Sequence, residues 1–127
     1  MDYTFIYYHR IRFPSVSGET IQVLRDYYAM SGNAGVVHIL YRSPFPLKES
    51  QINDSLKDYG VKRSPSFCMH RIVDRKLDRY RTKRKVIHLT KLSKKTVIIV
   101  TRSLDHAGHA ISIRDKFSSG RAVKVIL

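Results

Sequence analysis

Cysteine, tryptophan and long apolar runs are scarce or missing in this sequence of 127 residues. The one cysteine, Cys68, excludes an intrachain disulfide and a cysteine-based zinc site. Cysteine usage this low favours a reducing compartment, so the expected location is the cytoplasm. No apolar run approaches the ~20 residues that a membrane-spanning helix needs. The first ten residues also lack the basic flank and small-residue cleavage site of a signal peptide.

Acidic residues are also few, with 10 Asp and Glu against 24 Lys and Arg and a formal charge of +14. Residues 62–95 carry thirteen of the basic residues and only two acids. A run of one sign often marks a solvated helix face. An imbalance this large also opposes folding through self-repulsion, which favours an anionic partner. The candidate surface for that partner is Arg79, Arg81, Lys83, Arg84 and Lys85. Nucleic acid fits it, and so does an anionic membrane, which would place the protein at the inner face of the membrane.

Strand and helix patterns alternate along the whole chain. Aromatic and β-branched runs predict strands over residues 3–8, 36–41, 66–73, 96–101 and 122–127. Apolar residues at helical spacing predict helices from a Ser17 cap to Gly32, over 48–59, over 74–91, and from a Ser103 cap to 117. Residues 9–17 are predicted as a loop, and Cys68 as a buried, inert thiol in its strand. The chain is therefore expected to be one α/β domain, doubly wound, with a mostly parallel five-stranded Rossmann-like sheet and helices on both faces.

Ligands of such sheets bind outside the carboxyl ends of the strands, near the point where the strand order reverses. The segments expected there are residues 9–18, 42–46, 74 onward and 102–106. The sequence has no Walker A loop, G-x-G-x-x-G or G-x-S-x-G motif. His106 and His109 share a helix face but have no carboxylate suitably placed beside them, so no metal site is predicted.

Several segments in this order are similar to a known family. They are Phe13–Glu19 (FPSVSGE) before a helix, Val37–Arg42 (VHILYR), Asp58–Val61 (DYGV), and Thr101–Ala107 (TRSLDHA) before a helix and the final Val123–Leu127 strand. The set resembles the N-terminal half of GT-B glycosyltransferases of the family-4 type. The resemblance implies transfer of a sugar from a nucleotide-sugar donor, which is a substrate rather than a cofactor, to a sugar or lipid acceptor.

The resemblance also suggests roles for particular residues. Gly18, at the start of the first helix, is expected near the donor diphosphate, because a residue without Cβ allows close backbone approach. Arg102 and Ser103 lie in the crevice position, where cations and amides would stabilise the leaving diphosphate. His106 is the candidate catalytic residue toward a sugar hydroxyl, and His9 is a candidate on the acceptor side.

Arg12 is the other acceptor-side candidate. Three of the candidate residues also have a purely structural interpretation. Gly18 is then only a helix-start glycine, Arg102 either an ion-pair partner of Asp105 or a capping residue, and His106 a partly exposed helix histidine.

The family's second half is not encoded in this sequence. No glutamate follows Glu49, so the paired-glutamate motif of the C-terminal, donor-binding domain cannot occur. Residues 1–127 are thus expected to be the acceptor-side half, inactive without a C-terminal domain that a partner chain would supply. The alternative is a non-enzymatic, basic Rossmann-like module that binds nucleic acid or an anionic membrane surface.

Overall fold

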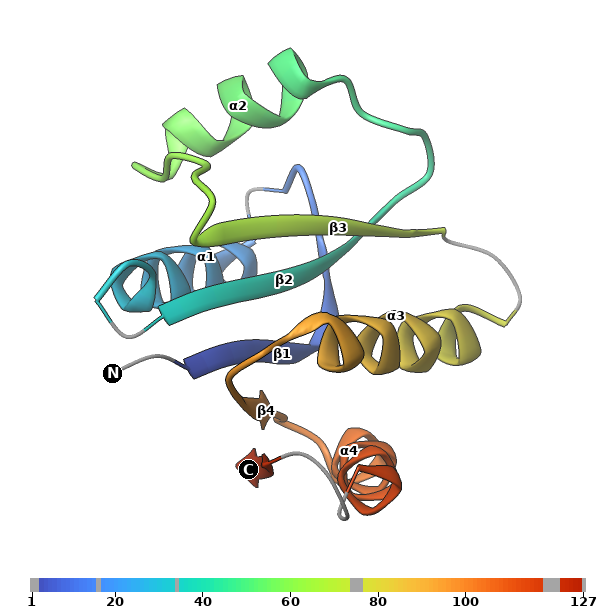
Figure 1. Ribbon diagram of the computed structural model, residues 1–127. Helices are drawn as coiled ribbons and strands as arrows, with labels where there is room; N and C mark the ends of the chain where they lie inside the picture. The colour runs from blue at the N-terminus through green and yellow to red at the C-terminus, as the bar shows by residue number, and fades with distance from the viewer. Residues whose placement is uncertain (1–2, 16, 34, 74–76, 118–121, 127) are drawn as a thin grey trace.

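A computed structural model describes residues 3–15, 17–33, 35–73, 77–117 and 122–126 of the chain. The described residues form strands and helices in alternation, as Figure 1 shows. In chain order these are β1 (Tyr3–Arg12), α1 (Gly18–Met30), β2 (Gly35–Ser43), α2 (Glu49–Asp58), β3 (Phe67–Val73), α3 (Asp78–Leu92), β4 (Thr96–Val100), α4 (Leu104–Lys116) and β5 (Val123–Ile126).

The five strands make one parallel sheet in the order β3-β2-β1-β4-β5. This order confirms the predicted doubly wound α/β fold. Strand β1 lies at the centre, and the chain proceeds outward from it first through β2 and β3, then through β4 and β5. The strand order therefore reverses between β1 and β4, which is where a ligand crevice is expected in such a sheet.

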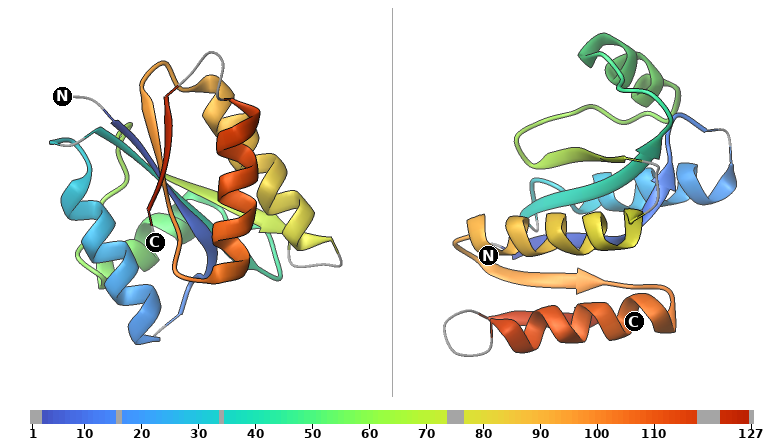
Figure 2. Two further views of the ribbon diagram at one scale, coloured as in Figure 1. Left: turned by 90° about the horizontal axis from the view of Figure 1, so that it is seen from below. Right: turned by 90° about the vertical axis from the view of Figure 1, so that its right-hand side faces the viewer.

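Helices cover both faces of the sheet, with α1 on one side and α3 and α4 on the other (Figure 2). Successive residues of β1 point to opposite faces and are buried in both cores. Phe5 and Tyr7 pack with α1 and α2, whereas Ile6 and Tyr8 pack with α3 and α4. Burial on both faces explains why Phe5–Tyr8 of this strand is an unbroken run of apolar and aromatic residues.

Two serines cap helices as the sequence predicts. The Ser17 hydroxyl accepts a hydrogen bond from the Thr20 N–H at 3.3 Å and begins α1. The Ser103 hydroxyl accepts one from the His106 N–H at 3.1 Å and begins α4. Such caps satisfy amide groups that have no partner within the helix. They also define where the two helix N-termini meet the carboxyl edge of the sheet.

The prediction of a loop from His9 onward is wrong for its first residues, because β1 continues to Arg12. Residues 10–12 pair with residues 40–42 of β2. Ile11 is buried in the α1 side of the core between two arginines that are less buried. The alternation of Arg10, Ile11, Arg12 and Phe13 is a strand pattern. Because proline breaks strands, Pro14 favoured a loop, and the predicted loop began too early, at His9.

Two further predictions need correction. Helix α3 begins at Asp78 rather than at residue 74, and residues 74–76 lie outside the described residues. Cys68 is only half-buried, with its sulfur 3.6 Å from the Pro65 carbonyl oxygen. Its strand, β3, is at the edge of the sheet. An edge strand has a neighbour on one side only, so a mid-strand position there does not ensure burial.

Leu77, the residue before α3, has a left-handed backbone with φ of 71° and a side chain that is 69% exposed. This conformation costs a residue with a Cβ roughly 1 kcal/mol, and exposure means that the side chain contributes little packing. We expect Leu77→Gly to raise the free energy of unfolding by about 0.5–1 kcal/mol. Urea denaturation followed by circular dichroism measures this. A loss of stability in the variant would show that the leucine side chain stabilises the start of α3.

Candidate functional site

A bulge in β1 lies at the point where the strand order reverses. The pairing of β1 with β4 ends at Tyr7, opposite Val100. On the other side of β1, Tyr7 pairs with Ile39 but Arg10 pairs with the next residue, Leu40. Tyr8 and His9 are thus extra residues in β1. Bulges of this kind redirect side chains at the ends of strands, and here the bulge places His9 over the carboxyl edge.

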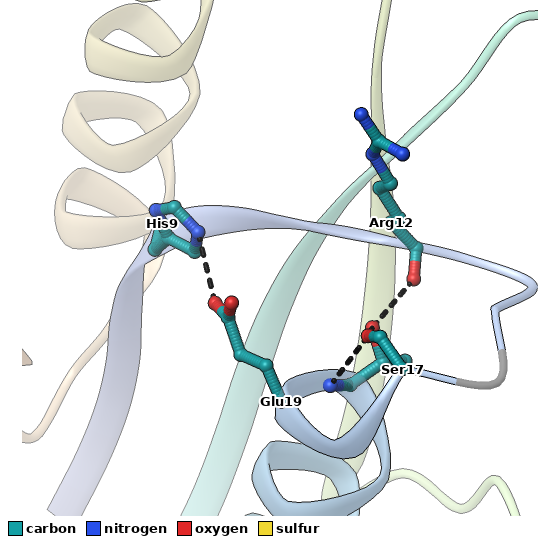
Figure 3. Close-up of polar contacts among 5 residues, drawn as sticks. His9, Arg12, Ser17 and Glu19 are labelled. Atoms are coloured by element: carbon teal, nitrogen blue, oxygen red, sulfur yellow. Dashed lines mark hydrogen bonds and ion pairs between the residues drawn. The ribbon is translucent and has the colours of Figure 1, made fainter.

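His9 contacts the first turns of two helices from opposite faces of the sheet. Its Nε2 lies 3.1 Å from Oε1 of Glu19 in α1 (Figure 3). Its ring lies 5.3 Å from the ring of His106 in α4, measured between centroids. The structure thus brings together two of the predicted site residues, His9 and His106, and adds a carboxylate that was not predicted. Helix N-termini attract anions, so this is also where an anionic group is favoured.

Both histidines of this pair are held in the neutral form at neutral pH. Burial lowers the pKa of His9 below its usual value of 6.5, and the charges of Arg10 and Arg42 act in the same direction. The Glu19 carboxylate opposes this change but does not outweigh it. Burial likewise lowers the pKa of His106, and repulsion from His9 in its protonated form would lower it further. A neutral imidazole has one nitrogen that can accept a proton or a hydrogen bond.

The ion-pair geometry fixes which nitrogen of His9 is the acceptor. When His9 is neutral and its Nε2–H donates to Glu19, Nδ1 carries the lone pair. A carboxylate that orients a histidine in this way also stabilises the imidazolium that forms on proton uptake. His9 and Glu19 therefore have the geometry of a general base with its orienting group. His9 is 37% exposed and Glu19 53% exposed, so the pair is accessible to a ligand.

Arg102 lies directly after β4 with its guanidinium 5.9 Å from the centre of the Tyr7 ring. No ion pair joins it to Asp105 among the residues that the structure describes, so that alternative interpretation gains no support. The cation faces the ring, which is a stabilising arrangement. Burial raises the pKa of Tyr7, the positive charge of Arg102 lowers it, and the negative charge of Glu19 raises it. Arg102 therefore lies at the same carboxyl edge of the sheet as the His9–Glu19 pair.

Gly18 and Ser103 occupy the starts of the two helices. A Cβ added to Gly18 would meet no atom within 4 Å, so the fold itself does not need glycine there. Ser103 uses its oxygen as the cap of α4, which leaves its hydroxyl hydrogen for a further acceptor. Both positions present backbone amides toward the carboxyl edge.

Arg12 is separated from the other candidates. Figure 3 shows its side chain directed away from His9. Its carbonyl oxygen accepts a hydrogen bond from the Thr20 hydroxyl at 3.0 Å, which ties the end of β1 to α1. The structure thus gives the Arg12 backbone a structural part and does not bring its guanidinium to the His9–His106 pair.

Several buried polar atoms near the carboxyl edge have no hydrogen-bond partner among the described residues. They include the Tyr8 hydroxyl, His106 Nδ1, Thr101 Oγ1 and Arg42 Nε. Burial raises the pKa of Tyr8 to about 12, so its hydroxyl keeps its proton and remains a donor. Unsatisfied buried groups are rare in folded proteins and often mark a place for a ligand or water. Their concentration at the ends of β1, β2 and β4 marks this edge as the candidate functional site.

The five basic residues predicted as one surface do not share one face of α3. Lys83 Nζ is 3.2 Å from Ser112 Oγ of α4, whereas Lys85 acts on His38 and His70 in the sheet. Arg84, which is between them in sequence, is exposed, and its guanidinium is 5.7 Å from the centre of the Tyr80 ring. A helix of fifteen residues distributes neighbouring positions around its axis. The charge therefore surrounds α3 instead of forming a flat patch.

Sequence analysis missed four contributors to the site: Glu19, Tyr8, Arg42 and Thr101. Glu19 was treated only as part of the helix start, because its link to His9 depends on a bulge that no local pattern announces. An acidic residue in the first turn of a helix is ordinarily explained by the helix dipole. Tyr8, Arg42 and Thr101 are recognisable only through burial without a partner, which requires coordinates.

No group of three or more His, Cys, Asp or Glu in the described ranges is arranged to hold a metal ion. Among the described helices, none is long and apolar enough to cross a membrane. A scan against protein-family models and searches of curated proteins and of solved structures each find no match for this chain.

Proposed function

We propose that this chain is the acceptor-side, N-terminal half of a GT-B-type glycosyltransferase, and that its crevice holds the diphosphate of a nucleotide sugar beside an acceptor hydroxyl. One observation carries the proposal. His9 contacts the first turns of α1 and α4 at the reversal of strand order, and Arg102 lies over the ring of nearby Tyr7. This arrangement combines cationic and dipolar groups for a leaving diphosphate with a neutral base for a hydroxyl.

The diphosphate is expected at the N-terminus of α1 and beside Arg102. The open space at Gly18 allows an oxyanion to approach the backbone amides of the first turn. Arg102 is exposed and its planar guanidinium suits bidentate contact with phosphate oxygens. The hydroxyl of Ser103 is a further donor at the start of α4.

The acceptor hydroxyl is expected at Nδ1 of His9. That nitrogen carries the lone pair when Nε2–H donates to Glu19, and the lowered pKa keeps it unprotonated at neutral pH. His106 lies beside it with an unpartnered Nδ1, and a hydrogen bond from that ring to a sugar hydroxyl would position the acceptor. Transfer itself would require a donor-binding half in addition to these residues.

Inorganic pyrophosphate tests the diphosphate contact without requiring activity. In the wild type we expect the amide resonances of Gly18, Glu19 and Ser103 to shift in a saturable NMR titration. Gly18→Ala and Arg102→Ala are each expected to weaken binding by about tenfold, which corresponds to ~1.4 kcal/mol. Gly18→Ala should leave stability equal or slightly higher, because alanine favours helix and has open space there.

Gly108→Ala and Arg114→Ala are the matched controls. Gly108 also has no atom within 4 Å of an added Cβ, and Arg114 is an exposed arginine at the other end of α4. Both controls should bind pyrophosphate like the wild type. Unchanged binding in both Gly18→Ala and Arg102→Ala would remove the basis for a diphosphate site in this crevice.

A further inference from the structure

A second cationic site lies between the end of β3 and helix α3, outside the His9 crevice. It is a groove of about 330 Å³, called here the α3–β3 groove, lined by Arg71, Ile72, Val73, Arg81, Arg84, Lys85 and His88. None of the described residues that line it is acidic. Arg81, Lys85 and His88 follow one another at spacings of four and three residues, so they share the side of α3 that borders the groove.

One wall of the groove is held rigid by hydrogen bonds. Arg71 is half-buried, and its Nε and Nη2 donate to the Ser43 carbonyl oxygen at 3.2 Å and 2.9 Å. Neither bond uses Nη1. A guanidinium already fixed in place loses little conformational entropy when it binds an anion. The neighbouring Ile72 is 4% exposed and gives this wall an apolar base.

The acid nearest to Arg81 in sequence is engaged elsewhere. Asp78 is in the first turn of α3, three residues before Arg81, where the two would pair on an isolated helix. It instead forms an ion pair with Arg10 of β1. Within the described residues, no ion pair engages Arg81, Arg84 or Lys85. Like charges gathered without a counter-charge repel one another, and an anionic ligand would relieve that repulsion.

We propose that the α3–β3 groove binds a phosphomonoester group. Three guanidinium groups and one ammonium group match the oxygen atoms and the near-dianionic charge of such a group. The volume lies at the lower end of the ~300–1,000 Å³ range of ligand sites, so the ligand is small or only its head enters. Either a small phosphorylated metabolite or the head of a phospholipid supplies the same chemistry.

Glycerol 3-phosphate is the soluble probe, titrated by calorimetry at an ionic strength of about 0.15 M to suppress non-specific attraction. The test variant is Arg81→Gln/Lys85→Gln, which removes two charges from the groove. The control is Lys57→Gln/Lys62→Gln, which removes two charges from α2 and the segment after it. We expect saturable binding that the test variant weakens by about tenfold or more and the control by less than about twofold.

Vesicles of phosphatidylcholine with phosphatidic acid are the second probe and distinguish the two sources. Saturable binding of either probe that only the test variant loses supports the groove, and the probe bound more tightly identifies the source. Equal loss in both variants, or saturation with neither probe, overturns the proposal. The ring resonances of His88 report on this groove, whereas Arg102→Ala acts on the other crevice. Unchanged glycerol 3-phosphate binding in Arg102→Ala therefore separates this site from the proposed diphosphate site.

Discussion

Gly35→Ala is expected to lower the free energy of unfolding by about 3–5 kcal/mol. Gly35 begins β2 with φ of +133°, a conformation that residues with a Cβ rarely adopt. An added Cβ would lie 1.9 Å from the carbonyl oxygen and 2.7 Å from the nitrogen of Tyr3. These are backbone atoms of the paired strand β1, so no side-chain rotation removes the overlap. Urea denaturation followed by circular dichroism measures the loss.

Gly108→Ala is the control for that experiment. Gly108 lies inside α4, where an added Cβ meets no atom within 4 Å. Alanine in a helix interior is favoured over glycine, so this variant should gain up to about 1 kcal/mol. If Gly35→Ala unfolded at the same urea concentration as the wild type, the close approach of β1 and β2 at this end of the sheet would be wrong.

Acid is expected to destabilise the fold well above the pH at which carboxylates titrate. His38 Nδ1 and His70 Nε2 lie 2.8 Å apart on neighbouring strands, so one ring donates to the other only while at least one is neutral. Burial lowers the pKa of His38 to about 4 and that of His70 to about 3. The positive charge of Lys85 lowers the pKa of both rings further. The charges of Arg63 and His88 also lower the pKa of His70.

The direction of the pH dependence of stability follows from whether the unfolded or the folded state binds protons at the higher pH. An unfolded histidine protonates near pH 6.5, whereas these two remain neutral in the fold until the pH is much lower. Their stabilisation is thus present above pH ~6.5 and is lost as the pH falls toward ~4. Each histidine contributes a slope of at most ~1.4 kcal/mol per pH unit. Because the two rings are coupled and partly exposed, we expect a total loss of about 2–4 kcal/mol between pH 7 and 5.

His38→Asn/His70→Gln tests the assignment. The amide of asparagine takes the place of Nδ1 and that of glutamine takes the place of Nε2, so a neutral hydrogen bond remains possible without a titrating ring. Urea denaturation at several pH values should show a much flatter profile in this variant. His109→Gln, which replaces a half-buried histidine of α4 that does not act on the pKa of either ring, should retain the wild-type profile. A wild type equally stable at pH 7 and 5 would contradict the prediction.

The order and type of the helices and strands could be predicted from local sequence patterns. Five apolar runs, four helical periodicities and two serine caps predicted the alternation that the structure shows. The main error was at the end of β1, where Pro14 obscured the alternation of residues 10–13. The error mattered because that part of β1 contains the bulge. A bulge arises from how two partner strands pair, and the sequence of one strand does not contain that information.

The candidate site was predicted in part for the same reason. Its position at the carboxyl edge follows from any doubly wound topology, so His9, Arg102 and His106 were available as candidates. Arg12 was grouped with His9 because they are close in sequence, yet the extended strand separates their side chains. Glu19 was missed although it provides the orienting carboxylate.

Composition and periodicity by themselves determined that this chain is a basic α/β domain with helices on both faces of a parallel sheet. These properties depend on each residue's own chemistry and on its spacing from near neighbours. Only the tertiary structure decided which charges meet. It paired Asp78 with Arg10, Glu19 with His9 and His38 with His70, and it placed no acid among the described residues that line the α3–β3 groove. The reason is physical: such pairs join residues that are 10 to 68 positions apart, and only the packing of strands and helices sets their distances.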